Sequence, residues 1–360
     1  MKRSVLKRYL SIAAVFILAV VMCAGCSDNG GAKIKRVVTY TSTDTTVYST
    51  TAEVVKYVAD SVVEIKTESV TTQWGMQYVV SGAGSGVIVA HDEGFSAYYI
   101  LTNNHVVAGA REITVTLRSG DSYDATLVAT DVQGDIAVVS IKEKSTLNVA
   151  VWGNSDTLQI GEDVIAIGNP LGSLGGTVTK GILSATERAI PVGSYTMTLL
   201  QTDTAINPGN SGGGLFNMRG ELIGIVNAKT SDEEVEGICF AIPINTAREI
   251  FTDLIEDGVV AGRVTLGIEV AAGANNVIYV TAVDGAANGT FEQYDRIAEI
   301  NGNAVTSLLT YHDALAALKP NDEAQVTVYR GSVRQDWFGQ GLTFATEPTK
   351  FTVKAKQLEK

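Results

Sequence analysis

The chain has 360 residues, which is enough for two or three domains, and 45% of them are hydrophobic, so it can bury a sizeable core. Charged residues make up only 18%, and the formal net charge is −12. Because binding to nucleic-acid phosphates needs a basic surface, we expect no nucleic-acid partner.

Residues 1–25 have the order of a secretory signal. Basic residues come first, the apolar run Tyr9 to Met22 follows, and small residues end the segment. Ala24-Gly25-Cys26 resembles the lipobox of bacterial lipoproteins, which implies that Cys26 carries lipid as the first mature residue. Cys23 departs from that pattern, because Leu or Val is usual there. The alternative is an uncleaved anchor helix, near the short limit for a membrane span. Both readings place the body outside the cytoplasm, tethered to a membrane at the cell surface or in the periplasm.

Residues 26–50 are rich in Thr, Ser, Gly and Asp, and they predict a mostly flexible tether. Once the signal is removed, only Cys26 and Cys239 remain. If Cys26 carries lipid, no internal disulfide can form. Two cysteines and three scattered histidines also argue against a zinc site, so we expect neither a metal nor a cofactor.

Residues 51–258 indicate a mainly β domain. Short runs of Val, Ile, Thr and Tyr alternate with Gly and Asp turns, which is typical of barrels or sandwiches. We expect one barrel near residues 60–145 and another near 150–245, with a cleft between them. A helix with apolar residues from Ala247 to Ile255 follows, and Gly258 ends it.

Two candidate catalytic residues lie at strand ends of the first barrel. His105 follows the apolar run Ala97 to Leu101, and Asp135 precedes the buried run Ile136 to Val139. A carboxylate at such a position needs a partner, and an imidazole N–H is a suitable one because the pair fixes the histidine tautomer. Each residue alone is more often structural.

The third candidate is Ser211, in the Gly-rich segment Gly209-Asn210-Ser211-Gly212-Gly213. Glycines allow a substrate to approach the backbone, and the N–H groups of Gly209 and Ser211 can form an oxyanion hole. The segment also fits the Gly-x-Ser-x-Gly elbow of α/β-hydrolases. In that fold a helix and the histidine follow the serine, whereas here the next segments indicate strand, turn and strand. The order His105, Asp135, Ser211 is instead that of the chymotrypsin-like double β-barrel.

The segments around these three residues resemble the HtrA (DegP-like) family of bacterial trypsin-like serine proteases, and the likeness covers roughly residues 50 to 345. Further matching segments are Gln201 to Pro208, Ile167 to Pro170 and Phe240 to Ile244. The resemblance implies a serine endopeptidase with His105, Asp135 and Ser211 as its triad and a role in protein quality control or stress response. It also implies a substrate-binding set: Ala205, Ile206, Val226, Asn227 and Ala228.

Residues 262–345 resemble a PDZ domain (α+β), with Leu266-Gly267-Ile268 as its carboxylate-binding loop and Tyr311 to Leu318 as its groove helix. Such grooves bind peptide C-termini by adding a strand. The tail 346–360 carries no clear signal.

By resemblance, the partners are unfolded polypeptides and peptide C-termini, and the oligomer is a homotrimer. Ala205 at the pocket base implies a preference for small or medium aliphatic residues over Lys or Arg. Cys239 stands where the family commonly has Gly, and it either narrows the pocket or exposes a thiol. Two alternatives remain open: a peptide-binding holdase or scaffold with little proteolysis, and a signalling protease with a single membrane partner.

Overall fold

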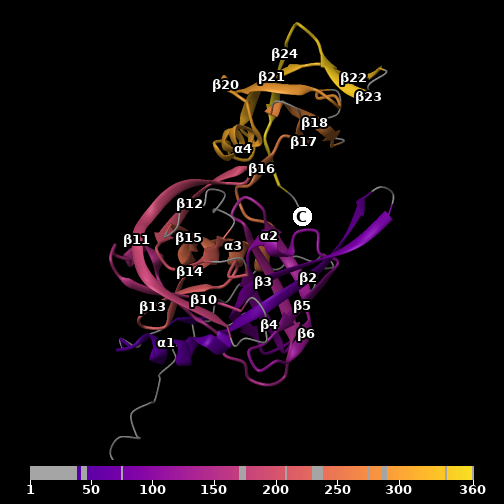
Figure 1. Ribbon diagram of the computed structural model, residues 1–360. Coiled ribbons are helices and arrows are strands. Elements are labelled where there is room, and N and C mark those ends of the chain that lie inside the picture. Colours follow the sequence, from indigo (N-terminus) through magenta and orange to yellow (C-terminus); the bar gives the residue numbers. More distant parts are fainter. Residues whose placement is uncertain are drawn as a thin grey trace, which may run out of the picture. The chain divides into compact units, whose positions relative to one another are not determined.

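The computed structural model describes residues 39–41, 47–73, 76–169, 176–206, 209–228, 238–273, 276–284, 290–336 and 339–358 (Figure 1). The signal and the predicted lipidation site Cys26 lie outside these residues. The chain divides into two compact units. The first contains residues up to Arg188 and Leu199–Glu256, and the second contains Ala189–Thr198 and Asp257–Lys360.

The first sheet has seven strands in the order β6-β5-β2-β3-β4-β8-β7. Its strands are β2 (Val62–Gln73), β3 (Met76–Asp92), β4 (Ala97–Thr102), β5 (Glu112–Thr116), β6 (Ser122–Asp124), β7 (Thr126–Asp131) and β8 (Ile136–Lys142). β4 and most of β8 are buried, because their apolar runs lie in the middle of the sheet. The strands β2 and β3 form a long ribbon whose far end leaves Tyr78 and Val79 exposed (Figure 1).

The second sheet has eight strands in the order β1-β9-β14-β13-β10-β11-β12-β15, and β14 also pairs with β15. That last pairing closes six strands into a barrel. The members are β1 (Tyr40–Thr41), β9 (Val151–Trp152), β10 (Asp163–Gly168), β11 (Thr177–Val192), β12 (Tyr195–Thr202), β13 (Gly214–Asn217), β14 (Glu221–Asn227) and β15 (Cys239–Pro243). The expected mainly β fold class is confirmed. Two barrels were expected, and among the described strand pairings the second sheet closes, whereas the first keeps β6 and β7 as its edges.

Helices occupy the connections of the first unit. They are α1 (Thr51–Val58), the 3-10 turns η1 (Ala59–Ser61) and η2 (Ser155–Thr157), α2 (Asn104–Val107) and α3 (Ile244–Glu256). Sequence reasoning missed α1, although its start has a capping box between Thr50 and Glu53, a device that stabilises a helix by about 0.5–2 kcal/mol. α3 begins earlier than expected, and it buries Ile250, Phe251 and Leu254.

The second unit is an α+β domain. Its main sheet has the order β17-β18-β19-β21-β24, with β20 beside β19, and β16 pairs with β25. The elements are β16 (Val264–Thr265), β17 (Ile268–Ala272), β18 (Ile278–Val283), β19 (Arg296–Ile300), β20 (Asn303–Ala304), α4 (Leu308–Ala316), β21 (Glu323–Tyr329), β22 (Gly331–Asp336), β23 (Gly339–Phe344), β24 (Thr349–Lys354) and β25 (Lys356–Gln357). Its core includes Ile278, Phe291, Ile300 and Val328.

The structure adds contacts to two of the expected segments. The tail 346–360 is part of the second unit, because β24 pairs with β21 along six residues and its alternate side chains Phe351 and Val353 pack against the core. The tether 26–50 is not wholly free. Its residues Tyr40–Thr41 pair with β9, and the N–H of Tyr48 donates to Met218 O at 2.8 Å.

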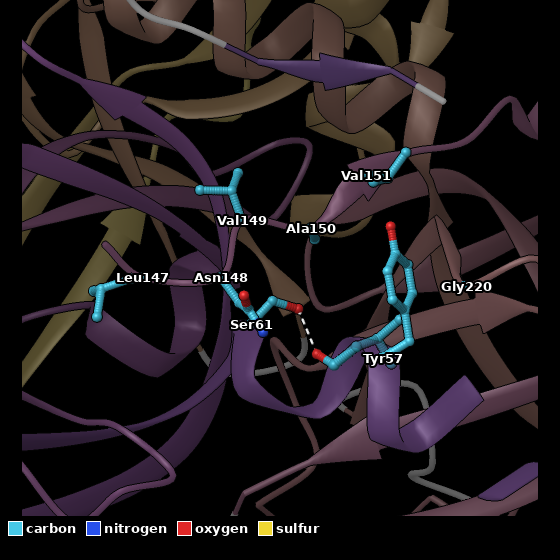
Figure 2. A pocket seen from close by; sticks show the side chains of 9 residues that line it. Tyr57, Ser61, Leu147, Asn148, Val149, Ala150, Val151 and Gly220 are labelled. Atoms are coloured by element: carbon cyan, nitrogen blue, oxygen red, sulfur yellow. Dashed lines mark hydrogen bonds between the residues drawn. The ribbon is translucent and has the colours of Figure 1, made fainter. Parts of the chain in front are cut away.

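A pocket of about 220 Å³ lies in the first unit, between α1 with η1 and residues 147–151 (Figure 2). Tyr57, Val58 and Ser61 form one side of it, and none of the candidate catalytic residues lines it. Within the described ranges, no helix is both long and apolar enough to cross a membrane.

Candidate active site

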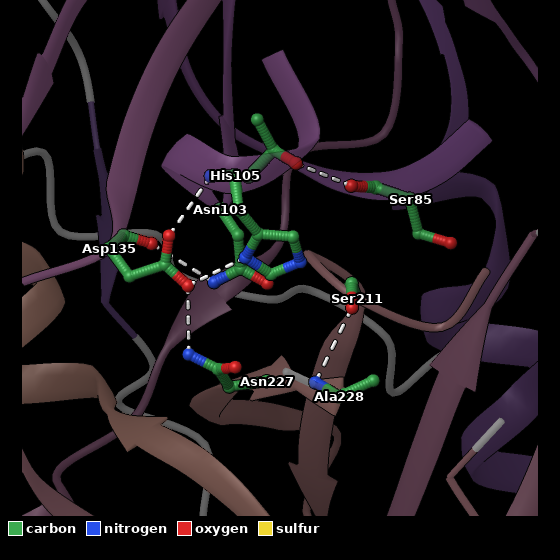
Figure 3. A network of polar contacts seen from close by, with 8 residues as sticks. Ser85, Asn103, His105, Asp135, Ser211, Asn227 and Ala228 are labelled. Atoms are coloured by element: carbon green, nitrogen blue, oxygen red, sulfur yellow. Dashed lines mark hydrogen bonds and ion pairs between the residues drawn. The ribbon is translucent and has the colours of Figure 1, made fainter. Parts of the chain in front are cut away.

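His105 and Asp135 form a close pair in the first sheet's connections (Figure 3). His105 lies in α2, directly after β4, and Asp135 lies directly before β8, the neighbour of β4. His105 Nδ1 is 2.7 Å from Asp135 Oδ2, and the backbone N–H of His105 donates to Asp135 Oδ1 at 3.0 Å. Both carboxylate oxygens therefore hold the histidine. With Nδ1 protonated, Nε2 is free to accept a proton, which is the arrangement a general base needs.

The turn before β8 fixes the position of Asp135. Its φ is 49°, a left-handed conformation that Asp tolerates better than most residues. Asp131 Oδ2 accepts the N–H of Gly134 at 2.8 Å and so closes the turn. The carbonyl of Asp135 accepts from Asn104 N and from Asn103 Nδ2, both at 3.1 Å. These bonds hold Asp135, whose side chain is buried, in a sparsely populated backbone conformation, as is common at functional sites.

Asn227, at the end of β14, contacts the acid. Its Nδ2 donates to Asp135 Oδ2 at 2.9 Å, and the residue is 1% exposed. The same oxygen thus accepts from His105 and from Asn227. Sequence reasoning placed Asn227 among the substrate-binding residues. Its side chain continues the hydrogen bonds of Asp135 into the second sheet, so the two sheets share one hydrogen-bonded network.

Ser211 lies in the turn before β13, and β14 connects it to the acid. The N–H of Ala228, the residue after Asn227, donates to Ser211 Oγ at 3.3 Å. Asp135 and Ser211 are therefore both bonded to consecutive residues at one strand end. Among the described side chains, Ser211 Oγ makes no hydrogen bond to His105. Figure 3 shows the imidazole drawn between the carboxylate and the hydroxyl.

The glycines around Ser211 permit close backbone contacts. Gly212 has a φ of 82°, and a Cβ there would come within 2.2 Å of Ser85 O, so no other residue fits without a shift. Gly209 has a φ of 100°. In the described part of the chain, the N–H groups of Gly209 and Ser211 donate no hydrogen bond. Two such donors are available to a negatively charged oxygen.

The other residues expected to bind substrate differ in accessibility. Ala205 is exposed, and Ile206 packs in part against the barrel core. Val226 is fully buried, and its N–H and carbonyl bond to Gly213 and Gly212 at 2.9 Å each. Its side chain and its backbone are therefore both engaged within the barrel. Among the five residues of this set, Ala205 is exposed and Ile206 and Ala228 are partly exposed.

The loop expected to bind carboxylates in the second unit precedes β17. Leu266 is buried, Gly267 has a φ of 74°, and Ile268 begins the strand. The N–H of Gly267 donates to Thr265 Oγ1 at 3.0 Å, and its carbonyl accepts from Asp284 N at 2.8 Å. The expected groove helix is present as α4, which begins three residues earlier than predicted.

Cys239 opens β15 and pairs with Thr202. It is a free, half-buried thiol, and burial raises its pKa above the ordinary value. Because the thiolate is the nucleophile, we expect iodoacetamide to alkylate native Cys239 several times more slowly than the urea-unfolded chain at pH 8. As the pH is raised further, alkylation of the native chain should keep speeding up after alkylation of the unfolded chain has reached its maximum rate. Peptide mass spectrometry at Cys239 measures both, and equal rates would contradict a desolvated thiol.

Comparison with family models identifies two domains. Residues 84–225 match the trypsin-like peptidase domain, and residues 264–337 match the PDZ domain. The first match spans the pair formed by His105 and Asp135 and also Ser211. The second spans β16 to β22 and α4 of the second unit, and β24 lies beyond it.

Individual proteins that the chain resembles are also named as proteases. The serine protease Do-like HtrB of Bacillus subtilis is 49% identical over 51% of this chain and 41% of its own length. The serine protease Do-like HtrA of Lactococcus lactis is 38% identical over 70% of this chain and 68% of its own. The chain spans less than two thirds of the Bacillus and Lactobacillus helveticus relatives. The solved HtrA-type protease AlgW with a decapeptide is 31% identical, with a TM-score of 0.54 over 86% of this chain and 99% of that one.

Proposed function

Because this chain belongs to the HtrA (DegP-like) family of trypsin-like serine proteases with a PDZ domain, we propose that it is a serine endopeptidase with His105, Asp135 and Ser211 as its triad. The observation that carries the proposal is the hydrogen-bonded line from Asn227 through Asp135 to His105, with Ser211 bonded to the residue after Asn227. Neither a metal nor a cofactor takes part in the proposed steps.

The reaction begins with a rotation of Ser211. Its bond to the N–H of Ala228 is long, at 3.3 Å, and therefore weak, so the hydroxyl can turn toward Nε2 of His105 at small cost. Nε2 takes the proton as Oγ attacks the peptide carbonyl carbon. The N–H groups of Gly209 and Ser211 meet the resulting oxyanion, and Asp135 stabilises the imidazolium. The proton then passes to the leaving amine as the C–N bond breaks, and water repeats the sequence on the acyl-enzyme.

Unfolded or damaged polypeptides are the proposed substrates, and the PDZ domain is proposed to bind peptide C-termini. A peptide would add a strand beside β17, next to α4, with its carboxylate at the loop Leu266 to Ile268. AlgW structures with a decapeptide and with a tripeptide support peptide binding in this family. The described features that serve this role are the positive φ of Gly267 and the free edge of β17 in the sheet order.

An extracytoplasmic, membrane-tethered location is part of the proposal. Relatives in Pseudomonas putida and Haemophilus influenzae are named as probable periplasmic proteases. The basic and apolar residues 1–25 and Cys26 support export and lipid anchoring. A homotrimer is proposed from family resemblance. Light scattering of the purified chain gives its mass directly.

The competing function is a holdase or scaffold that binds peptides without cutting them. Incubation with fluorescein-labelled casein separates the two functions, because only a protease releases small fluorescent fragments. A fluorophosphonate probe tests the site in the same sample. The proposal expects fragment release and a single phosphonylated peptide that contains Ser211. Casein that is bound but stays intact, with no label at Ser211, would favour the holdase.

A cleavage specificity is proposed from the family resemblance, which assigns Ala205 to the base of the substrate pocket. Ala205 supplies no charge at the base, and a buried Lys or Arg side chain would then lack a counter-charge. We expect small or medium aliphatic residues, such as Ala or Val, on the acyl side of the cut. A peptide library analysed by mass spectrometry gives the profile. A profile dominated by Lys or Arg would contradict this assignment.

A further inference from the structure

Ser85 bonds the first sheet to the loop that carries Ser211. It lies in β3, is fully buried, and no motif in the sequence singled it out. Its N–H donates to Ser211 O at 2.8 Å, and its carbonyl accepts from Thr102 Oγ1 at 2.7 Å (Figure 3). Both backbone polar groups of Ser85 are thus hydrogen-bonded.

The hydroxyl of Ser85 makes two further bonds, both to the second sheet and its loops. Oγ donates to the carbonyl of Gly209 at 2.7 Å and accepts the N–H of Asn169 at 2.8 Å. Asn169 directly follows β10 and is itself buried. One hydroxyl therefore joins the end of β10 to Gly209, and it comes from the opposite sheet.

Gly209 depends on such a bond more than other residues would. It has a φ of 100° and no side chain, so its backbone can adopt many conformations, and its peptide planes turn easily unless a partner holds them. The carbonyl of Gly209 belongs to the 209–210 peptide plane, which lies between the N–H of Gly209 and the N–H of Ser211. A bond that holds this plane therefore limits how the two N–H groups can turn relative to each other. In the described residues, the hydrogen-bond partner of that carbonyl is the hydroxyl of Ser85.

We propose that Ser85 is a positioning residue for the oxyanion hole: its hydroxyl holds the 209–210 peptide plane, which joins the two donors of the hole, so that the N–H groups of Gly209 and Ser211 point together at the reacting oxygen. This inference rests on the proposed protease function and deepens it. Ser85 touches neither the substrate nor the reacting atoms. Its effect on the reaction passes through the segments that its hydroxyl holds, Gly209 and Asn169, and should appear in the chemical step and not in substrate binding.

The test compares Ser85→Ala with a matched variant in the full-length protein. Ser61 is also buried, and its Oγ donates to a backbone carbonyl, that of Val58, at 2.6 Å (Figure 2). Ser61→Ala thus removes the same kind of bond from a hydroxyl whose hydrogen-bond partner is Val58 and not Gly209. An internally quenched peptide with valine on the acyl side of the cut is the substrate, and kcat, KM and the melting temperature are measured for each protein.

We expect Ser85→Ala to lower kcat about 10–100-fold, below the 10²–10³-fold loss that follows removal of a hole donor itself. KM should stay within about twofold, because substrate binding does not use the hole fully before the oxyanion forms. Ser61→Ala should melt at a lower temperature with kcat close to wild type. If kcat of the two variants falls equally, or if only KM changes in Ser85→Ala, the inference is overturned.

A second variant covers the case in which Ser85→Ala does not fold. Ser85→Cys keeps a similar shape but only a weak hydrogen-bond donor. Its kcat, KM and melting temperature are then compared with those of Ser61→Ala in the same way. The failure of the inference can be told from the failure of the proposed function. A wild type that neither cleaves peptide nor takes up a fluorophosphonate at Ser211 would end both. An active wild type with an unaffected Ser85 variant would end the inference alone.

Discussion

Ser211→Ala should lower kcat by roughly 10⁶-fold and leave the binding of unfolded casein unchanged. In the proposed mechanism the hydroxyl of Ser211 is the protein group that forms a covalent bond to the substrate. Its removal therefore leaves no route through an acyl-enzyme. Loss of a nucleophilic serine from a triad costs about this factor, and a residual rate remains from the oxyanion hole and from binding. Release of fluorescent casein fragments measures cleavage, and fluorescence anisotropy measures binding.

The same variant also separates protease from holdase. Purified in parallel, it reports any contaminating host protease, because such a contaminant cuts casein at the same rate in both samples. Its fold should be intact, since Ser211 contributes its backbone carbonyl, and not its hydroxyl, to the bond with Ser85 N. An unchanged casein cleavage rate in Ser211→Ala would reject the nucleophile. A wild type as inactive as the variant would leave binding as the function.

The three candidate catalytic residues were predictable because each interrupts a local pattern. His105 and Asp135 border buried strands where apolar residues would be usual, and Ser211 lies among glycines that suit neither a helix nor a core. The strands themselves follow from alternation and from short Val and Ile runs. These signals are local, so a sequence carries them without knowledge of the partner strand.

The contacts of Ser85 and Asn227 could not be found in this way. Each joins residues more than ninety positions apart: Ser85 with Gly209 and Asn227 with Asp135. In a β structure, which side chain meets which is fixed by register and by the packing of sheets. A single sequence shows that Ser85 lies between two glycines. It does not show that the hydroxyl faces a carbonyl of the other sheet.

Segments at the edges of the domains were missed for a different reason. In β24, Phe351 and Val353 alternate with exposed residues, which is a strand signal, but it is short and lies beside a charged tail. The strand Tyr40–Thr41 has two residues and depends on its pairing with β9. Elements of this length have little intrinsic preference. Their structure comes from an existing sheet edge, which the sequence does not display.

Asp135→Asn should lower kcat by about 10⁴-fold with a nearly intact fold, because an amide cannot satisfy all the donors that face it. Oδ2 accepts from His105 Nδ1 and Asn227 Nδ2, and Oδ1 accepts from the N–H of His105. If the NH₂ group takes the position of Oδ2, it opposes the Asn227 donor and forces the proton of His105 onto Nε2. If it takes the position of Oδ1, it opposes the N–H of His105, and no charge remains to stabilise the imidazolium.

Asn227→Ala is the matched variant for this argument, since it removes one bond to the carboxylate and leaves the charge. A hydrogen bond to a charged group contributes about 1.5–3 kcal/mol, and only part of it bears on the transition state, so we expect kcat to fall about tenfold. In the double variant Asp135→Asn with Asn227→Ala, the Asn227 donor no longer opposes an NH₂ group at the Oδ2 position. The inactive tautomer, with the His105 proton on Nε2, should then be more populated. The activity of the double variant should therefore not exceed that of Asp135→Asn. Kinetics on one quenched peptide compare all three. An Asp135→Asn enzyme with more than a tenth of wild-type kcat would show that the carboxylate does not orient the base.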